Sequence, residues 1–205
     1  MSPDLLPSIS DLRRVTQSLA MLDAILSPEW EYRYYSFNCQ WAPQEEMASM
    51  RDGSGDEWFL LLDSAGAAIK GFAHELAHES PIASEIHRQV PKSFATFLSE
   101  PAFSMQNATF CYWRGKDETV WKKVAGATTE DGSSDMLTPL IAGPSGYKSW
   151  AEEYFEMPVS LEAVAAIFSH QPLTPFIALA LNPDVDMDSV YEDAAEIGYP
   201  CDKGE

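Results

Sequence analysis

The chain has 205 residues, of which 45% are hydrophobic and 12% aromatic, so it has enough apolar side chains for a folded core and lacks a disordered protein's composition. Its 32 acidic and 13 basic residues give a formal net charge of −19. A negative field of this strength repels nucleic-acid backbones and anionic membranes, so neither is an expected partner, and it attracts basic proteins.

Two further features predict a cytoplasmic protein without a membrane segment. The first residues lack the basic and apolar regions of a secretory signal, and no apolar run approaches the roughly 20 residues that span a bilayer. The three cysteines, Cys39, Cys111 and Cys201, are far apart and form no CxxC pattern. We therefore expect free thiols in a reducing compartment.

An amphipathic helix is predicted near the start of the chain. We expect Ser10 to be its N-cap and Pro28 to end the segment, so the helix lies within residues 1–28. Apolar residues recur there at steps of three and four, which places them on one helix face: Leu12, Val15, Leu19, Leu22 and Leu26.

An antiparallel meander is predicted next. The aromatic run at residues 30–41 favours a first strand. Three more strands, separated by glycine turns, are expected at residues 46–51, 57–63 and 67–72. In the third, Leu60 and Leu62 would point to one face of the sheet and Phe59 and Leu61 to the other. This continuous apolar run predicts a central strand that is covered on both faces.

The remainder is predicted to contain one helix, a hairpin and a helical C-terminal part. Residues 91–100 have helical spacing after an initial proline. Residues 109–114 and 119–124 form the expected hairpin, with Trp113 and Trp121 paired across it. The expected N-caps of the C-terminal helices are Ser145, Ser160, Thr174 and either Asp186 or Asp188.

Together these elements predict an α+β fold: an N-terminal helix, an antiparallel β meander, and then a mostly helical C-terminal part packed on the sheet. We expect one domain over residues 1–205. Its parts are a helix at 1–28, mainly sheet with one inserted helix at 30–124, and helices at 145–198.

Several segments resemble a family of uncharacterised bacterial proteins of about this length. They are WEYRYYSFN (30–38), the segment from MASM to FAHE (47–75), PKSFATFLSEPAF, YKSWAEEYFE, PLTPFIALALNP and EIGYP. This resemblance covers nearly the whole chain and implies no particular activity. The segment VPKSFATFLSEPAF is also similar to the Pro-aromatic-Phe-Leu helix of SMI1/KNR4-like immunity proteins, although the Asn-Gly that often follows there is absent. That second resemblance implies an acidic cytosolic domain from a bacterial toxin system.

HELAH at residues 74–78 is the sharpest chemical motif. On a helix, this pattern would let His74 and His78 bind one Zn²⁺ while Glu75 activates the bound water. A flanking glycine and proline leave room for only about two helical turns. We therefore expect a polar loop and no metal, with a zinc-dependent hydrolase as the alternative function. The candidates for a third ligand, neither favoured by spacing, are His87 and Glu100.

Two acidic segments resemble metal loops but are interpreted as a turn and a helix cap. DGSGDE at residues 52–57 lacks the ligand spacing of a calcium loop, so a hairpin turn is expected. DVDMD at residues 184–188 lies at a predicted helix start, where carboxylates face the positive end of the helix dipole. No nucleophile motif and no phosphate-binding glycine pattern occurs, so no catalytic residue and no cofactor is predicted.

The leading hypothesis is a binding protein rather than an enzyme, namely an acidic inhibitor or immunity-type factor for a basic protein partner. Residues 151–205 contain 12 acidic residues and a single basic one, which makes this the expected binding region. A soluble acidic domain whose charge only aids solubility is a further alternative. The candidate binding residues are Glu152, Glu153, Glu156, Glu192, Asp193 and Glu196, with Asp52 and Asp56 on the turn of the sheet.

Overall fold

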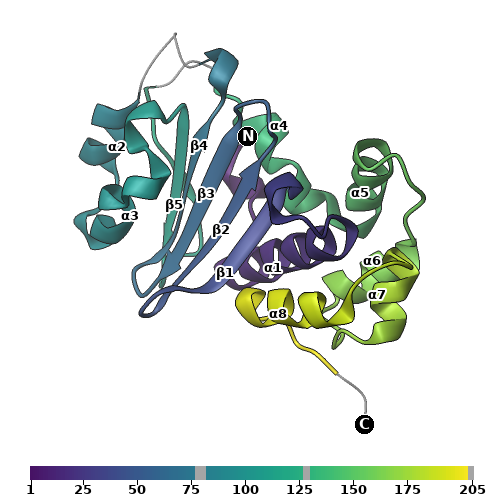
Figure 1. Cartoon of the computed structure of the whole chain (residues 1–205). Coiled ribbons are helices and arrows are strands. Elements are labelled where there is room, and N and C mark those ends of the chain that lie inside the picture. Colours follow the sequence, from purple (N-terminus) through teal and green to yellow (C-terminus); the bar gives the residue numbers. More distant parts are fainter. Residues whose placement is uncertain (77–81, 127–129, 203–205) are drawn as a thin grey trace.

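The computed structural model describes residues 1–76, 82–126 and 130–202, and its centre is a six-stranded antiparallel sheet (Figure 1). Each strand pairs with the next one in the chain, in the order β1-β2-β3-β4-β5-β6. The α+β fold and the meander are therefore confirmed. The strands are β1 (Tyr35–Ala42), β2 (Glu45–Arg51), β3 (Glu57–Asp63), β4 (Gly66–Phe72), β5 (Phe110–Gly115) and β6 (Lys122–Lys123).

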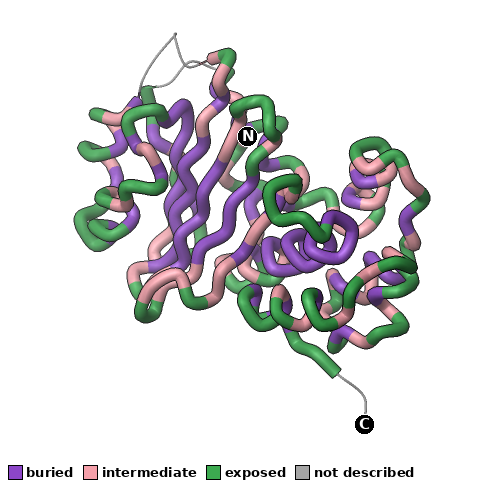
Figure 2. The backbone as a smooth tube through the Cα atoms, viewed as in Figure 1, coloured by how far each residue is buried: buried purple, intermediate pink, exposed green. Residues whose placement is uncertain are grey.

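The third strand, β3, is buried on both faces as expected. Leu60 and Leu62 point into a large core on one face of the sheet. Phe59 and Leu61 point into a smaller core on the other face. Figure 2 shows the burial that results along the middle strands. The alternation inferred from the apolar run is therefore confirmed, because β3 has β2 and β4 on either side.

The large core is formed by α1 (Ile9–Leu26) and the helices that follow the sheet. The second half of α1 contacts the sheet on one side and helices on the other, so it is buried all round (Figure 2). Leu19, Leu22 and Ile25 have no exposed surface. The helices that follow the sheet are α4 (Ser133–Leu137), α5 (Pro139–Tyr154), α6 (Leu161–Phe168), α7 (Pro175–Leu181) and α8 (Met187–Ile197).

A smaller helical layer covers the opposite face of the sheet (Figure 1). It buries Phe94, Phe97 and Phe103 in the second core, and the rings of Phe59 and Phe103 stack with centroids 5.0 Å apart. The sequence did not predict α2, because only Ile86 of its seven residues is buried and no helical period is visible. The elements of this layer are α2 (Ala83–Gln89), η4 (Lys92–Phe94), α3 (Ala95–Ser99), η5 (Pro101–Phe103) and η6 (Met105–Asn107).

Three predicted element starts are wrong, each for a local reason. Ser8, not Ser10, is the N-cap of α1, because its hydroxyl accepts the backbone N–H of Asp11 at 3.1 Å. The aromatic run opens as a 3₁₀ turn, η2 (Trp30–Tyr32), before β1 begins. Ser145 is not an N-cap, because α5 already begins at Pro139. The helix predicted to follow Ser145 is the part of α5 beyond a kink at Gly143, whose φ of 66° and ψ of −171° lie outside the helical region.

The expected pairing of Trp113 with Trp121 is wrong. Trp113 pairs instead with Lys122 in the short strand β6 and points into the smaller core. Trp121 belongs to the large core, where its indole N–H donates to the carbonyl of Pro7 at 2.7 Å. The two rings therefore lie on opposite faces of the sheet.

The three N-caps expected for the last helices are confirmed. Ser160, Thr174 and Asp186 each accept a backbone N–H of the first helical turn at 3.3 Å. The carboxylates of the DVDMD segment therefore include a helix cap, as the sequence indicates. None of the described helices has both the length and the apolar character that crossing a membrane would require.

Candidate functional site

The acidic residues expected to bind a partner lie in two separate places, one at and just after the end of α5 and the other on α8. Figure 1 shows α8 along the lower side of the molecule and the end of α5 at its right-hand side. Glu152 and Glu153 are in the last turn of α5, and Glu156 follows the end of that helix. The other three residues are on α8: Glu192, Asp193 and Glu196.

Some of these carboxylates have partners within the protein. Asp193 accepts two hydrogen bonds from the guanidinium of Arg33, at 2.7 and 2.8 Å. Glu152 forms an ion pair with Lys148 at 2.5 Å, and this contact holds the pKa of Glu152 below its usual range. Glu196 accepts a longer hydrogen bond from an amide at 3.3 Å. The exposed members of the set are Glu153, Glu156, Glu192 and Glu196.

The two acidic residues of the β2–β3 turn hold that turn in place. One oxygen of Asp52 accepts the backbone N–H groups of Ser54, Gly55 and Asp56, at 2.8 to 3.0 Å. Asp56 in turn contacts both the backbone N–H and the Nδ1 atom of His74, at 2.8 and 2.7 Å. The hairpin turn expected for DGSGDE is therefore confirmed, and both carboxylates have a structural use.

The HELAH motif begins with a single 3₁₀ turn, η3 (His74–Leu76), that follows β4. Nδ1 of His74 faces Asp56, and this hydrogen bond raises the pKa of His74. His78 lies outside the described residues. No group of three His, Cys, Asp or Glu side chains within the described part of the chain is gathered closely enough to hold a metal ion. Of the two candidates for a third ligand, Glu100 caps η5, because its carboxylate accepts the backbone N–H of Ala102 at 3.0 Å.

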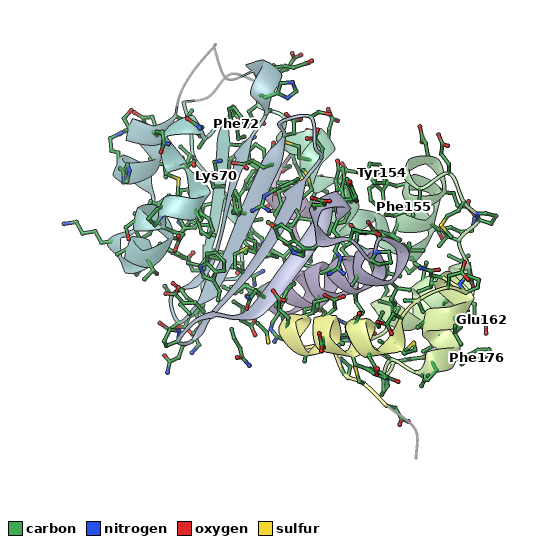
Figure 3. All side chains as sticks on the ribbon, in the orientation of Figure 1. Lys70, Phe72, Tyr154, Phe155, Glu162 and Phe176 are labelled. Carbon is green, nitrogen blue, oxygen red and sulfur yellow. The ribbon has the colours of Figure 1, made fainter. Side chains whose placement is uncertain are left out.

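An apolar groove lies between α6 and α7 in the C-terminal part, with a volume of about 680 Å³. Small side chains line it, among them Ala163, Ala166 and Ala180, together with the larger Phe176. Phe176 is 80% exposed, the highest value among the large apolar side chains in the described ranges. Figure 3 shows Phe176 close to Glu162 at the outer surface of these helices.

The charges on this groove are acidic. Glu162 and Asp202 line it, and the described lining residues include no lysine or arginine. Asp202 is held at the groove by a backbone hydrogen bond, in which its N–H donates to the carbonyl of Leu173 at 2.8 Å. A second bond of 2.8 Å joins Leu173 to Pro200. The arrangement therefore combines an apolar surface with a negative rim.

Sequence reasoning did not identify the groove. The apolar run at residues 176–181 has the size of a core segment, so nothing in it marks an exposed position. In the structure Ala178 and Leu181 face the core, whereas Phe176 and Leu179 face outward. One signal was available in the sequence. A surface helix buries one face, and residues 176–181 contain more apolar side chains than one face can hold, so some of them must be exposed.

One carboxyl group is buried inside the large core. The Oδ2 atom of Asp23 accepts the backbone N–H groups of Tyr34 and Tyr35 at 2.9 and 2.8 Å, and Oδ1 accepts the hydroxyl of Tyr147 at 2.8 Å. Burial raises the pKa of Asp23 to about 7, although these hydrogen bonds and the nearby Arg33 favour the ionised form. Asp23 thus ties α1 to β1 and α5, and it is inaccessible to a ligand.

A second internal polar cluster contains an ion pair between β6 and the segment before α4. Lys123 contacts Asp131 at 2.6 Å, and Ser133 donates to the same carboxyl group at 2.6 Å. The hydroxyl of Tyr112 donates to Ser133 at 3.0 Å. Ser133 has no exposed surface, so its hydroxyl is not available as a nucleophile for a substrate in solution.

Comparison with known proteins finds no relative: no family model, no curated protein and no solved structure matches the chain. The resemblances to an uncharacterised bacterial family and to SMI1/KNR4-like proteins therefore stay predictions. A functional proposal has to rest on the geometry of the α6–α7 groove and on the charge of the chain.

Proposed function

We propose that the protein is an acidic binding protein for a basic protein partner, and that the groove between α6 and α7 receives an amphipathic helix of that partner. The observation that carries the proposal is the 80% exposed Phe176 on a groove with an acidic rim. Exposed apolar patches with polar rims are typical of protein-binding surfaces.

The shape of the groove suits a helix. An amphipathic helix docks by placing apolar side chains at positions i, i+3 or i+4 and i+7 into an apolar groove. Helix α6 has 8 residues and is about 12 Å long at 1.5 Å per residue. Such a groove accommodates about two turns of the partner. The alanines along it leave room for the partner's apolar side chains, and Phe176 packs beside them.

The negative charge of the groove favours a positively charged partner. Glu162 and Asp202 lie on its rim, within a segment of 12 acidic residues and one basic residue. Complementary charge around an apolar centre steers encounter and excludes partners of the wrong sign. Lysine and arginine on the polar face of the docking helix therefore complete the fit.

An inhibitor or immunity-type role in the cytoplasm belongs to the same proposal. Enzymes that bind phosphates have basic surfaces, and an acidic protein blocks such a surface while associating rapidly. The similarity to SMI1/KNR4-like immunity proteins supports this role. Cys39, Cys111 and Cys201 form no disulfide, which supports a reducing compartment. Nucleic acids and membranes are not proposed as ligands, because the net charge of −19 repels both.

The proposal is tested by titrating the protein into a labelled synthetic helix of leucine and lysine, about 14 residues or four turns long, in a fluorescence-anisotropy assay. A peptide of the same composition with a scrambled order is the control for charge. Phe176→Ala tests the groove. Leu5→Ala is its matched control, because Leu5 is also exposed, at 56%, but lies outside the groove.

We expect Phe176→Ala to weaken binding of the amphipathic peptide by about 30-fold, equivalent to the roughly 2 kcal/mol of an interface hot spot. Leu5→Ala should bind as the wild type does. Equal affinity of the two variants would show that the groove is not the binding site. Equal affinity of the two peptides would show simple charge attraction and favour a protein whose acidity serves solubility alone.

A further inference from the structure

The structure assigns a second binding site, distinct from the α6–α7 groove, and we propose that it takes a small aromatic carboxylate. The site is a cavity of about 250 Å³ between η2, the β2–β3 turn and the last turn of α5. Ser36 and Ser49, paired across β1 and β2, line it, and their hydroxyl oxygens are 2.7 Å apart. These hydroxyls are neutral polar groups in a cavity wall that also contains aromatic rings and charged side chains.

Aromatic rings form much of the wall. Trp30, Tyr32 and Tyr154 are 59%, 63% and 44% exposed, although they are among the largest apolar side chains of the protein. Tyr34 also lines the cavity, with its ring centroid 5.4 Å from that of Tyr154. Exposed rings gathered around one cavity favour a flat, ring-bearing ligand that stacks on them.

Arg51 contributes a positive charge to the cavity wall. Its guanidinium carbon lies 5.8 Å from the ring centroid of Trp30 and 5.4 Å from that of Phe59. The carboxylate opposite it in the sheet, Glu57, contacts the buried Lys70 at 2.9 Å. Among the described residues, Arg51 forms no ion pair. A guanidinium with unused donors, held between rings, suits a carboxylate that binds both its nitrogens.

The other charges at the cavity narrow the ligand to a small monoanion. Arg33 also lines the cavity, but Asp193 occupies its guanidinium. Glu31 lines the cavity too and is exposed, so a dianion would meet repulsion from it as well as from the net charge of −19. The volume lies below the range of roughly 300–1,000 Å³ that drug-sized ligands occupy. A single ring with one carboxylate fits these limits.

Isothermal titration calorimetry of the whole protein with 4-hydroxybenzoate tests the site. Neutral 4-hydroxybenzamide, ring-free acetate and phenyl phosphate are the comparison ligands. The variants are Arg51→Gln and Glu31→Gln. Arg88→Gln is the matched control, because Arg88 is an exposed arginine on α2 that pairs with Glu85. Thermal melts of all variants establish that they are folded.

We expect 4-hydroxybenzoate to bind more tightly than the three other ligands. Arg51→Gln should weaken that binding at least about tenfold, the effect of one charge-assisted hydrogen bond. Glu31→Gln should strengthen it, and Arg88→Gln should leave it unchanged. The proposal is overturned by any of three results: no heat with 4-hydroxybenzoate at about 10 mM, equal binding of the neutral amide, or an affinity that Arg51→Gln does not change.

Discussion

Replacing Asp23 with asparagine should remove a large part of the pH dependence of stability. Between pH 3.8 and about 7 the folded protein keeps the Asp23 proton while the unfolded chain has lost it. Folding therefore takes up a proton in this range, and rising pH lowers the free energy of unfolding. The effect is absent below pH 3.8 and complete above pH 7, because the folded and unfolded states then hold the same number of protons.

The magnitude follows from the two pKa values. At about 1.4 kcal/mol for each pH unit, the difference between 3.8 and about 7 corresponds to about 4 kcal/mol in total. About 3 kcal/mol of this falls between pH 5 and pH 8. Asparagine keeps the local contacts, because its oxygen accepts from Tyr34 and Tyr35 and its NH₂ group donates to the hydroxyl of Tyr147.

Urea unfolding at pH 5 and pH 8, followed by tryptophan fluorescence, measures this difference directly. The change in the free energy of unfolding from pH 5 to pH 8 should be about 3 kcal/mol more favourable for Asp23→Asn than for the wild type. Asp4→Asn, at an exposed position of the N-terminal turn, is the control and should follow the wild type. If Asp23→Asn also follows the wild type, the three hydrogen bonds and Arg33 outweigh burial and Asp23 is ionised in the folded protein.

Two further predictions concern the sheet. Leu61→Ala should lower the free energy of unfolding by about 2–5 kcal/mol, because Leu61 is 2% exposed in the smaller core. In a urea titration, the exposed control Leu5→Ala should change this free energy by less than about 0.5 kcal/mol. An equally small loss for Leu61→Ala would contradict the central placement of β3. Gly71→Ala should cost about 1–3 kcal/mol, because an added Cβ would lie 1.9 Å from the ring of Phe110. The double variant Gly71→Ala/Phe110→Leu should recover part of that loss in the same assay, and no recovery would mean that the ring is not the cause.

Elements with strong local patterns could be predicted from the sequence. Strand β3 was placed at its observed bounds, because an apolar run between a glycine turn and an Asp-Ser-Ala-Gly turn has few other solutions. The layer of α2 and α3 could not be placed in the same way. It consists of short helices and 3₁₀ turns whose shape depends on burying Phe94, Phe97 and Phe103 against a distant part of the chain.

The candidate site was predictable in its charge but not in its position. The excess of acidic residues is visible in the sequence, yet the partners of individual carboxylates are not. Asp193 binds Arg33, which is 160 positions away, and Asp56 binds His74. The exposure of Phe176 depends in a similar way on which face of α7 the rest of the fold covers. Such facts arise from tertiary contacts that no local pattern encodes.

A map of amide chemical-shift changes tests the proposed binding of a basic helix most directly. The isotope-labelled protein is titrated with the amphipathic leucine–lysine peptide, and each backbone amide is followed by NMR. The largest changes are predicted in α6 and α7, around Glu162 and Phe176, with the scrambled peptide producing none of them. Largest changes at Glu152–Glu156 and Glu192–Glu196 instead would contradict the groove and return the binding site to the acidic faces of α5 and α8.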